Sequence, residues 1–125
     1  MFDIQIINNE AVLFNDDDNY IVPVNLESLR DNNGKILYNL PDGSYVWIWS
    51  DNSITWLDSN GKPHRDGDMP TYIETNGYMQ YCNHGEFHRI GGPACIWPNG
   101  REEYWIDGKY YTKKDYESEM ADRNA

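Results

Sequence analysis

Short runs of aromatic and β-branched residues alternate along this chain with polar asparagine-glycine and aspartate-glycine pairs. The pair Asn76-Gly77 recurs as Asn99-Gly100, and the glycines Gly61, Gly85 and Gly108 recur at almost the same interval. Such pairs between β-type runs favour two-residue hairpin turns, in which both central residues have positive φ. Two interleaved turn series at one period predict two strands per repeat.

The repeat runs "WLDSNGKPHRDGDMPTYIETNG" (56–77), then "YCNHGEFHRIGGPACIWPNG" (81–100), then a truncated "YWIDGKYYTKKDYE" (104–117). The first two copies share a histidine-arginine pair, a later glycine and a proline. The third copy has Tyr110-Tyr111 instead of the pair. An upstream stretch, 33–53, keeps the rhythm but lacks the pair, and it is interpreted as a degenerate first unit.

This pattern resembles the MORN family of hairpin repeats, whose units have a similar length and carry an asparagine-glycine-lysine turn, a histidine and spaced glycines. It is most similar to the variant with "HRxDGPA" cores found in phage, giant-virus and bacterial proteins, here "HRDGDMP" and "HRIGGPA". The resemblance covers the stretch 55–117. It implies a mainly β fold, an antiparallel meander of β-hairpin repeats with a period of about 23–24 residues.

The segments outside the repeats predict further elements. Residues 3–7, 11–14 and 20–24 have the composition of three short strands, and 25–32 that of a helical turn capped by Asn25. Thr112, with Asp115 three positions later, begins a short C-terminal helix that caps the open end of the array. We therefore expect an N-terminal strand cluster (1–32) and a repeat region with its helix (33–125), together in one compact domain.

Composition narrows the class of partner. The 21 acidic against 10 basic residues give a net charge of −11, which disfavours direct binding to nucleic acid and favours a protein with a basic surface. The chain shows neither a signal peptide nor an apolar run long enough to cross a membrane. These features predict a cytoplasmic protein.

The His64-Arg65 and His88-Arg89 pairs are open to two interpretations. Identical pairs one repeat apart favour a structural role, with the histidine packed under a turn and the arginine bonded to carbonyls of the neighbouring hairpin. The alternative is a row of basic groups that holds a phosphate or carboxylate ligand.

Metal binding and nucleophilic catalysis are weaker interpretations of the same region. Cys82, His84, His88 and Cys95 lie close in sequence, and His84 and His88 have one spacing known from zinc sites, but no second cysteine pair completes a set of ligands. Neither cysteine follows a helix start that would lower its pKa. We expect no metal, no cofactor and no catalytic residue, hence a protein that is not an enzyme.

Aromatic residues provide the strongest candidate for a binding surface. In "YVWIWS", Tyr45, Trp47 and Trp49 share one face of a strand, whereas Val46 and Ile48 share the other. Both faces are therefore apolar, which favours packing against the N-terminal strands and leaves an interaction surface as the alternative. Later units place rings beside charges, which is typical of interface hot spots. The candidate protein interface consists of Tyr78, Tyr81, Trp97, Arg101, Tyr104 and Trp105.

The resemblance implies an antitoxin-like or anti-defence protein, encoded by a phage or a bacterium, that docks on an enzyme or defence component in the bacterial host cytosol and neutralises it. A protein that sequesters a nucleotide or phosphate signal through its histidine-arginine pairs is the alternative. A homodimer through an unpaired hairpin edge is also open.

Overall fold

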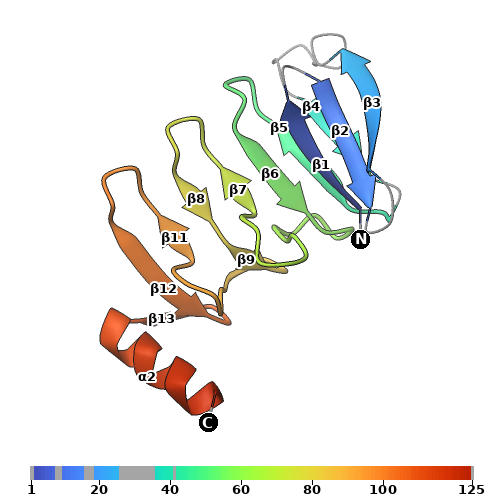
Figure 1. Ribbon diagram of the computed structural model, residues 1–125. Helices are drawn as coiled ribbons and strands as arrows, with labels where there is room; N and C mark the ends of the chain where they lie inside the picture. The colour runs from blue at the N-terminus through green and yellow to red at the C-terminus, as the bar shows by residue number, and fades with distance from the viewer. Residues whose placement is uncertain (1, 8–9, 16–18, 26–35, 41, 125) are drawn as a thin grey trace.

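The computed structural model describes residues 2–7, 10–15, 19–25, 36–40 and 42–124. The fold is mainly β, as expected, and its largest element is a long antiparallel meander of hairpins (Figure 1). In spatial order, its strands are β4 (Ile36–Asn39), β5 (Tyr45–Ile48), β6 (Ile54–Leu57), β7 (Tyr72–Ile73), β8 (Met79–Gln80), β11 (Cys95–Ile96), β12 (Glu102–Ile106) and β13 (Lys109–Tyr111).

Smaller elements accompany this sheet. The predicted N-terminal strands form an antiparallel sheet of β1 (Phe2–Ile7), β2 (Glu10–Asn15) and β3 (Asn19–Asn25), drawn at the β4 end of the meander in Figure 1. A hairpin of β9 (Cys82–Asn83) and β10 (Glu86–Phe87) lies at the start of the second complete repeat. The helical turn expected at 25–32 falls outside the described residues, apart from Asn25, which ends β3.

The C-terminal helix, α2 (Lys113–Arg123), contacts β12 and β13 at the far end of the array. Its start confirms the sequence prediction, because the Thr112 side chain accepts a hydrogen bond of 3.1 Å from the Asp115 N–H. The helix therefore covers the last hairpin, as an end cap of a repeat array must.

Most asparagine-glycine turns differ from the prediction. At Trp97–Arg101 the turn has five residues: the Trp97 N–H donates to the Arg101 carbonyl, and the Gly100 N–H donates to the Trp97 carbonyl. Only Gly100 has positive φ, +89°, and the Asn99 side chain accepts the Arg101 N–H at 2.9 Å. The same pattern recurs at 40–44, 49–53, 58–62 and 74–78. The prediction of two-residue turns is therefore wrong for this series.

Two turns of the second series, those at Gly85 and Gly108, are of the predicted two-residue type, whereas the turn at Gly61 has the five-residue form just described. His84 and Gly85 have φ of 46° and 96°, and Asp107 and Gly108 have φ of 49° and 78°. The Gly85 N–H donates to the Pro63 carbonyl at 2.8 Å, and the Gly108 N–H donates to the Phe87 carbonyl at 3.0 Å. Each bend thus rests on the preceding one, and the predicted period describes a real stack of repeats.

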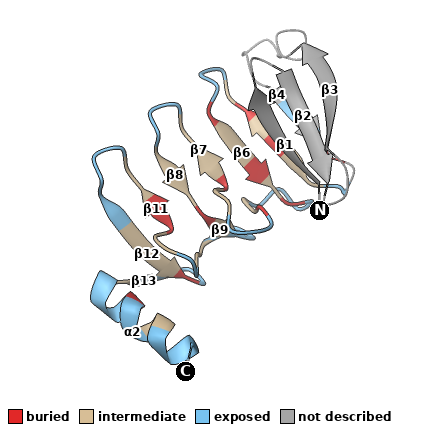
Figure 2. Ribbon diagram, viewed as in Figure 1, coloured by how far each residue is buried: buried red, intermediate tan, exposed pale blue. Residues whose placement is uncertain are grey.

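Buried and half-buried residues alternate along β5 (Figure 2). Val46 and Ile48 are buried, at 0% and 1% exposure, whereas Tyr45 and Trp47 between them are half-buried. One apolar face of this strand is therefore covered, and the aromatic face is partly open. No helix among the described residues has the length and apolar character needed to cross a membrane.

Candidate interaction surface and the histidine-arginine pairs

The histidines of the two complete repeats link each repeat to the next. His64 Nδ1 accepts a hydrogen bond from the His84 backbone N–H at 3.2 Å, and His88 Nδ1 accepts one from the Asp107 N–H at 3.0 Å. Both donors are the first residue of a two-residue turn. Because Nδ1 accepts, a neutral ring carries its proton on Nε2, which in His64 lies 2.9 Å from an Asp66 carboxylate oxygen.

The arginines bind carbonyl groups of their own loops. Arg65 Nη1 donates to the Pro70 carbonyl at 3.0 Å, and Arg89 Nη1 donates to the Pro93 carbonyl at 3.1 Å. The histidine-arginine pairs thus have the structural arrangement expected of them, with one correction: the carbonyls belong to the same loop rather than to a neighbouring hairpin.

The same arginines cover equivalent aromatic rings. The guanidinium carbon of Arg65 lies 3.7 Å from the ring centroid of Trp56, and that of Arg89 lies 3.8 Å from that of Tyr81. Arg89 also donates from Nε to Asp68 at 2.8 Å, and its side chain is only 16% exposed. Both guanidinium groups therefore already stack on a ring and bind a carbonyl group within the protein, and that of Arg89 also binds a carboxylate.

In the third repeat, which lacks the histidine-arginine pair, Tyr116 of α2 takes the place of the arginine. Its ring lies 4.7 Å from that of Tyr104, the residue equivalent to the covered rings of the earlier repeats. Its hydroxyl lies 2.8 Å from the Arg89 carbonyl and 2.6 Å from the Ile90 carbonyl, and it accepts the Gly92 N–H at 3.2 Å. Sequence reasoning predicted a capping helix but did not single out Tyr116. The missing histidine-arginine pair of the third repeat was the only sequence signal for its role.

The imidazole rings of His64 and His84 stack against each other, with centroids 3.7 Å apart and an interplanar angle of 7°. His84 Nδ1 lies 2.7 Å from Oδ2 of the buried Asp58. Burial raises the pKa of Asp58, but the hydrogen bonds from His84 and from the backbone N–H groups of Lys62 and Asn60 together lower this pKa below its usual value. The carboxylate therefore stays ionised and anchors the turn.

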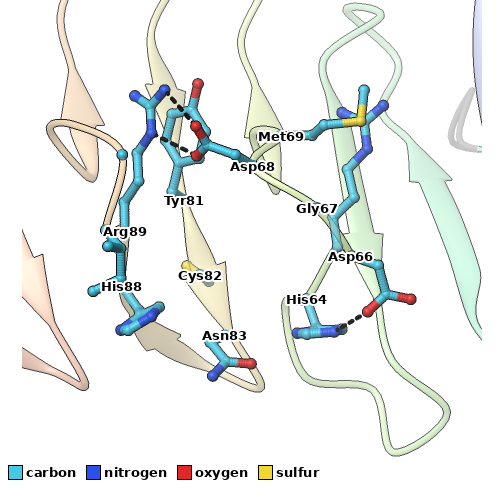
Figure 3. A pocket seen from close by; sticks show the side chains of 13 residues that line it. His64, Asp66, Gly67, Asp68, Met69, Tyr81, Cys82, Asn83, His88 and Arg89 are labelled. Carbon is cyan, nitrogen blue, oxygen red and sulfur yellow. Dashed lines mark hydrogen bonds and ion pairs between the residues drawn. The ribbon is translucent and has the colours of Figure 1, made fainter. Parts of the chain in front are cut away.

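A cavity of about 420 Å³ lies between the loops of the two complete repeats. Figure 3 shows the arrangement of its lining, with His64 and Asp66 on one side, His88 and Arg89 on the other, and Tyr81, Cys82 and Asn83 between them. Since Asp68 already pairs with the Arg89 guanidinium, the cavity offers an anion little uncompensated positive charge.

The two cysteines have neither the surroundings of zinc ligands nor those of nucleophiles. Burial raises the pKa of Cys82 and of Cys95 to about 11, with the nearby Cys95 contributing to the shift at Cys82, so both thiols are neutral near pH 7. Within the described part of the chain, no group of three or more histidine, cysteine, aspartate or glutamate side chains is placed to hold a metal ion.

The candidate interface residues do not form one surface. Strand alternation and ring contacts place Tyr78, Trp97, Arg101 and Trp105 on one face of the sheet. Tyr81 and Tyr104 lie on the opposite face, under Arg89 and Tyr116 respectively. The six candidate residues therefore belong to two faces, and Tyr81, which is 8% exposed, packs inside the protein.

One side of the sheet carries a row of aromatic side chains, half-buried except for the exposed Tyr110. We call it the aromatic face: Trp47, Trp49, Tyr72, Tyr78, Trp97, Trp105 and Tyr110. In the middle of the row, Tyr78 contacts the rings on both sides, Tyr72 with centroids 6.2 Å apart and Trp97 with centroids 5.1 Å apart. At the far end, Tyr110 contacts Trp105 and is 53% exposed. The face thus crosses several repeats.

Comparisons of the chain with protein-family models, with curated proteins and with solved structures gave no significant match.

Proposed function

We propose that this protein is a non-enzymatic binding protein that docks through its aromatic face on a partner protein with a basic surface. In this proposal the partner is an enzyme or defence component of the bacterial cytosol, and docking neutralises it. The observation that carries the proposal is the row of half-buried aromatic side chains on one side of a repeat-built sheet, in which Tyr72, Tyr78 and Trp97 contact one another in turn.

Two properties of the face support a protein partner. Tyrosine, tryptophan and arginine dominate interface hot spots because they bury a large area at a small cost in side-chain entropy. The rings also support one another, since Tyr78 lies against both Tyr72 and Trp97. A net charge of −11 favours rapid, salt-sensitive association with a basic surface.

The contacts of the histidine-arginine pairs favour docking over sequestration of a small anion. Arg65 and Arg89 are held by carbonyl groups and aromatic rings, and Arg89 is neutralised by Asp68. An incoming phosphate would have to displace these contacts. On the aromatic face the corresponding arginine, Arg101, is 66% exposed, so docking there would displace only an exposed contact.

The test compares capture from bacterial lysate by three chains: wild type, the double variant Tyr78→Ser/Trp97→Ser, and Ile90→Ser. Ile90 is a matched control because it is an exposed apolar residue, 43% exposed, in a loop that lines the cavity. Each variant is first checked for folding by circular dichroism. We expect one protein to be retained by wild type and by Ile90→Ser, lost from the double variant, and released at high salt.

The captured protein is then purified and its activity titrated with this chain. Inhibition that saturates at a fixed molar ratio supports neutralisation. Identical capture by all three chains, loss of the partner from Ile90→Ser alone, or turnover of the partner at catalytic amounts of this chain would contradict the proposal.

A further inference from the structure

The aromatic face carries an arginine of its own. The guanidinium carbon of Arg101 lies 4.8 Å from the ring centroid of Trp97, and its Nη2 lies 3.1 Å from Glu103 Oε2. Unlike the buried arginines of the repeat loops, the Arg101 side chain is 66% exposed. Such an exposed ion pair contributes little to stability and is readily displaced.

The carboxylate under this arginine is held in place from the other side. Glu103 Oε1 accepts a hydrogen bond from the Trp105 indole N–H at 3.2 Å, which leaves Oε2 directed toward Arg101. The Glu103 side chain is 22% exposed. A ring and an oriented carboxylate on a rigid strand together match a planar guanidinium, which can stack and form hydrogen bonds at once.

We infer that this place, formed by Trp97 and Glu103 with Tyr78 beside them, receives an arginine side chain of the partner, and that Arg101 occupies it in the free protein. The inference rests on the proposed function and specifies the chemistry of the partner: an arginine-bearing basic segment. Elsewhere the same fold uses this kind of contact, stacking Arg65 on Trp56 and Arg89 on Tyr81.

The neighbouring repeat extends the arrangement. Trp49, Glu74 and Trp97 hold equivalent positions, each at the start of a five-residue turn on successive hairpins. Equivalent positions on successive hairpins are two strand spacings apart, about 10 Å. A second carboxylate thus lies between two tryptophans along the row, which favours a partner segment with several cations, in agreement with the net charge of −11.

The experiment uses capped peptides in which glycine alternates with arginine, lysine or citrulline, titrated into the ¹⁵N-labelled full chain. We expect the arginine peptide to shift the indole N–H signals of Trp97 and Trp105 saturably and to leave that of Trp56, which is 5% exposed, in place. The lysine peptide should bind more weakly. The citrulline peptide, which keeps the shape but lacks the charge, should not bind.

Three variants test the assignment of residues. Arg101→Ala removes the internal competitor and should raise peptide affinity by about two- to fivefold, whereas Glu103→Gln should lower it by about as much. The matched control is Glu102→Gln, since Glu102 precedes Glu103 in β12, is exposed, and lies on the opposite face. This variant makes the same change in net charge and should leave affinity within experimental error of wild type.

Three outcomes would overturn the arginine site: equal loss of affinity in Glu102→Gln and Glu103→Gln, peptide shifts confined to the acidic loops around Asp66 and Asp68, or concentration-dependent self-association of Arg101→Ala. The capture test is independent of these three outcomes. If a partner is lost only from Tyr78→Ser/Trp97→Ser, docking is still supported. Conversely, peptide binding together with identical capture by all chains would keep the arginine site and contradict the proposed function.

Discussion

The Tyr116 hydroxyl connects the C-terminal helix to the last loop, and its removal in Tyr116→Phe tests whether α2 caps the array. The ring is 5% exposed, and its hydroxyl contacts the carbonyls of Arg89 and Ile90 and the N–H of Gly92. Loss of such a bond costs about 0.5–1.5 kcal/mol net, and more when a buried partner is left unsatisfied. We expect the free energy of unfolding to fall by about 1–3 kcal/mol.

Urea unfolding followed by tryptophan fluorescence measures this loss, and Tyr110→Phe is the matched control because its ring is 53% exposed. Amide hydrogen exchange locates the effect: the Arg89 N–H, bonded to the Trp105 carbonyl, should lose protection before the amides of β5 and β6 do. A change below about 0.5 kcal/mol, equal to that of Tyr110→Phe, would refute the capping role.

Two further predictions follow from the titrating groups. Asp58→Asn keeps an oxygen for the turn N–H groups but removes the charge beside His84. Because folding lowers the pKa of Asp58, the ionised carboxylate stabilises the fold above its unfolded-state pKa, and this stabilisation is lost as pH falls through its folded-state pKa. The variant should therefore be less stable by about 0.5–1 kcal/mol near pH 6, and this difference should vanish as pH falls through the lowered pKa of Asp58, as thermal unfolding across pH can check. With thiol pKa values of about 11, Cys82 and Cys95 should react slowly with a disulfide reagent at pH 8, Cys82 first because it lines the cavity, and a rapid reaction of the native protein would contradict the assignment. Since these pKa values are raised, the thiols' contribution to stability is present below about pH 9 and lost as pH rises toward 11.

The repeat and its period were predictable because glycines with positive φ recur at fixed spacing. The form of the turns was not. An asparagine-glycine pair fits a two-residue turn, where both residues have positive φ, and also a five-residue turn, where only the glycine does. The choice depends on which residues of the flanking strands pair. In the second series, His84 and Asp107 take positive φ because their N–H groups reach the histidine Nδ1 atoms of the preceding repeat, a contact between distant segments.

The candidate interface residues divide between the two faces of the sheet, four on the aromatic face and two on the covered one. Tyr104 and Trp105 are adjacent in one strand, so they must point to opposite faces, and alternation alone shows that both cannot belong to one surface. Which of them is covered depends on Tyr116, a residue of the C-terminal helix. Side-chain alternation is therefore available from sequence, whereas the identity of the covered face requires the tertiary contact.

The two faces of the sheet differ in how tightly their arginines are held, and this difference supports the proposal that a partner docks on the aromatic face. On the covered face, Arg65 and Arg89 stack on rings and bind carbonyls, so their displacement would disrupt the repeats. On the aromatic face, Arg101 covers Trp97 with a side chain that is 66% exposed and pairs with a glutamate of the same strand. To move Arg101 away from Trp97 costs about as much as breaking an exposed ion pair. A partner arginine would form an equivalent pair with Glu103 on binding. In the arginine site that we propose, one guanidinium would replace another, which would give the aromatic face specificity at little cost to the fold.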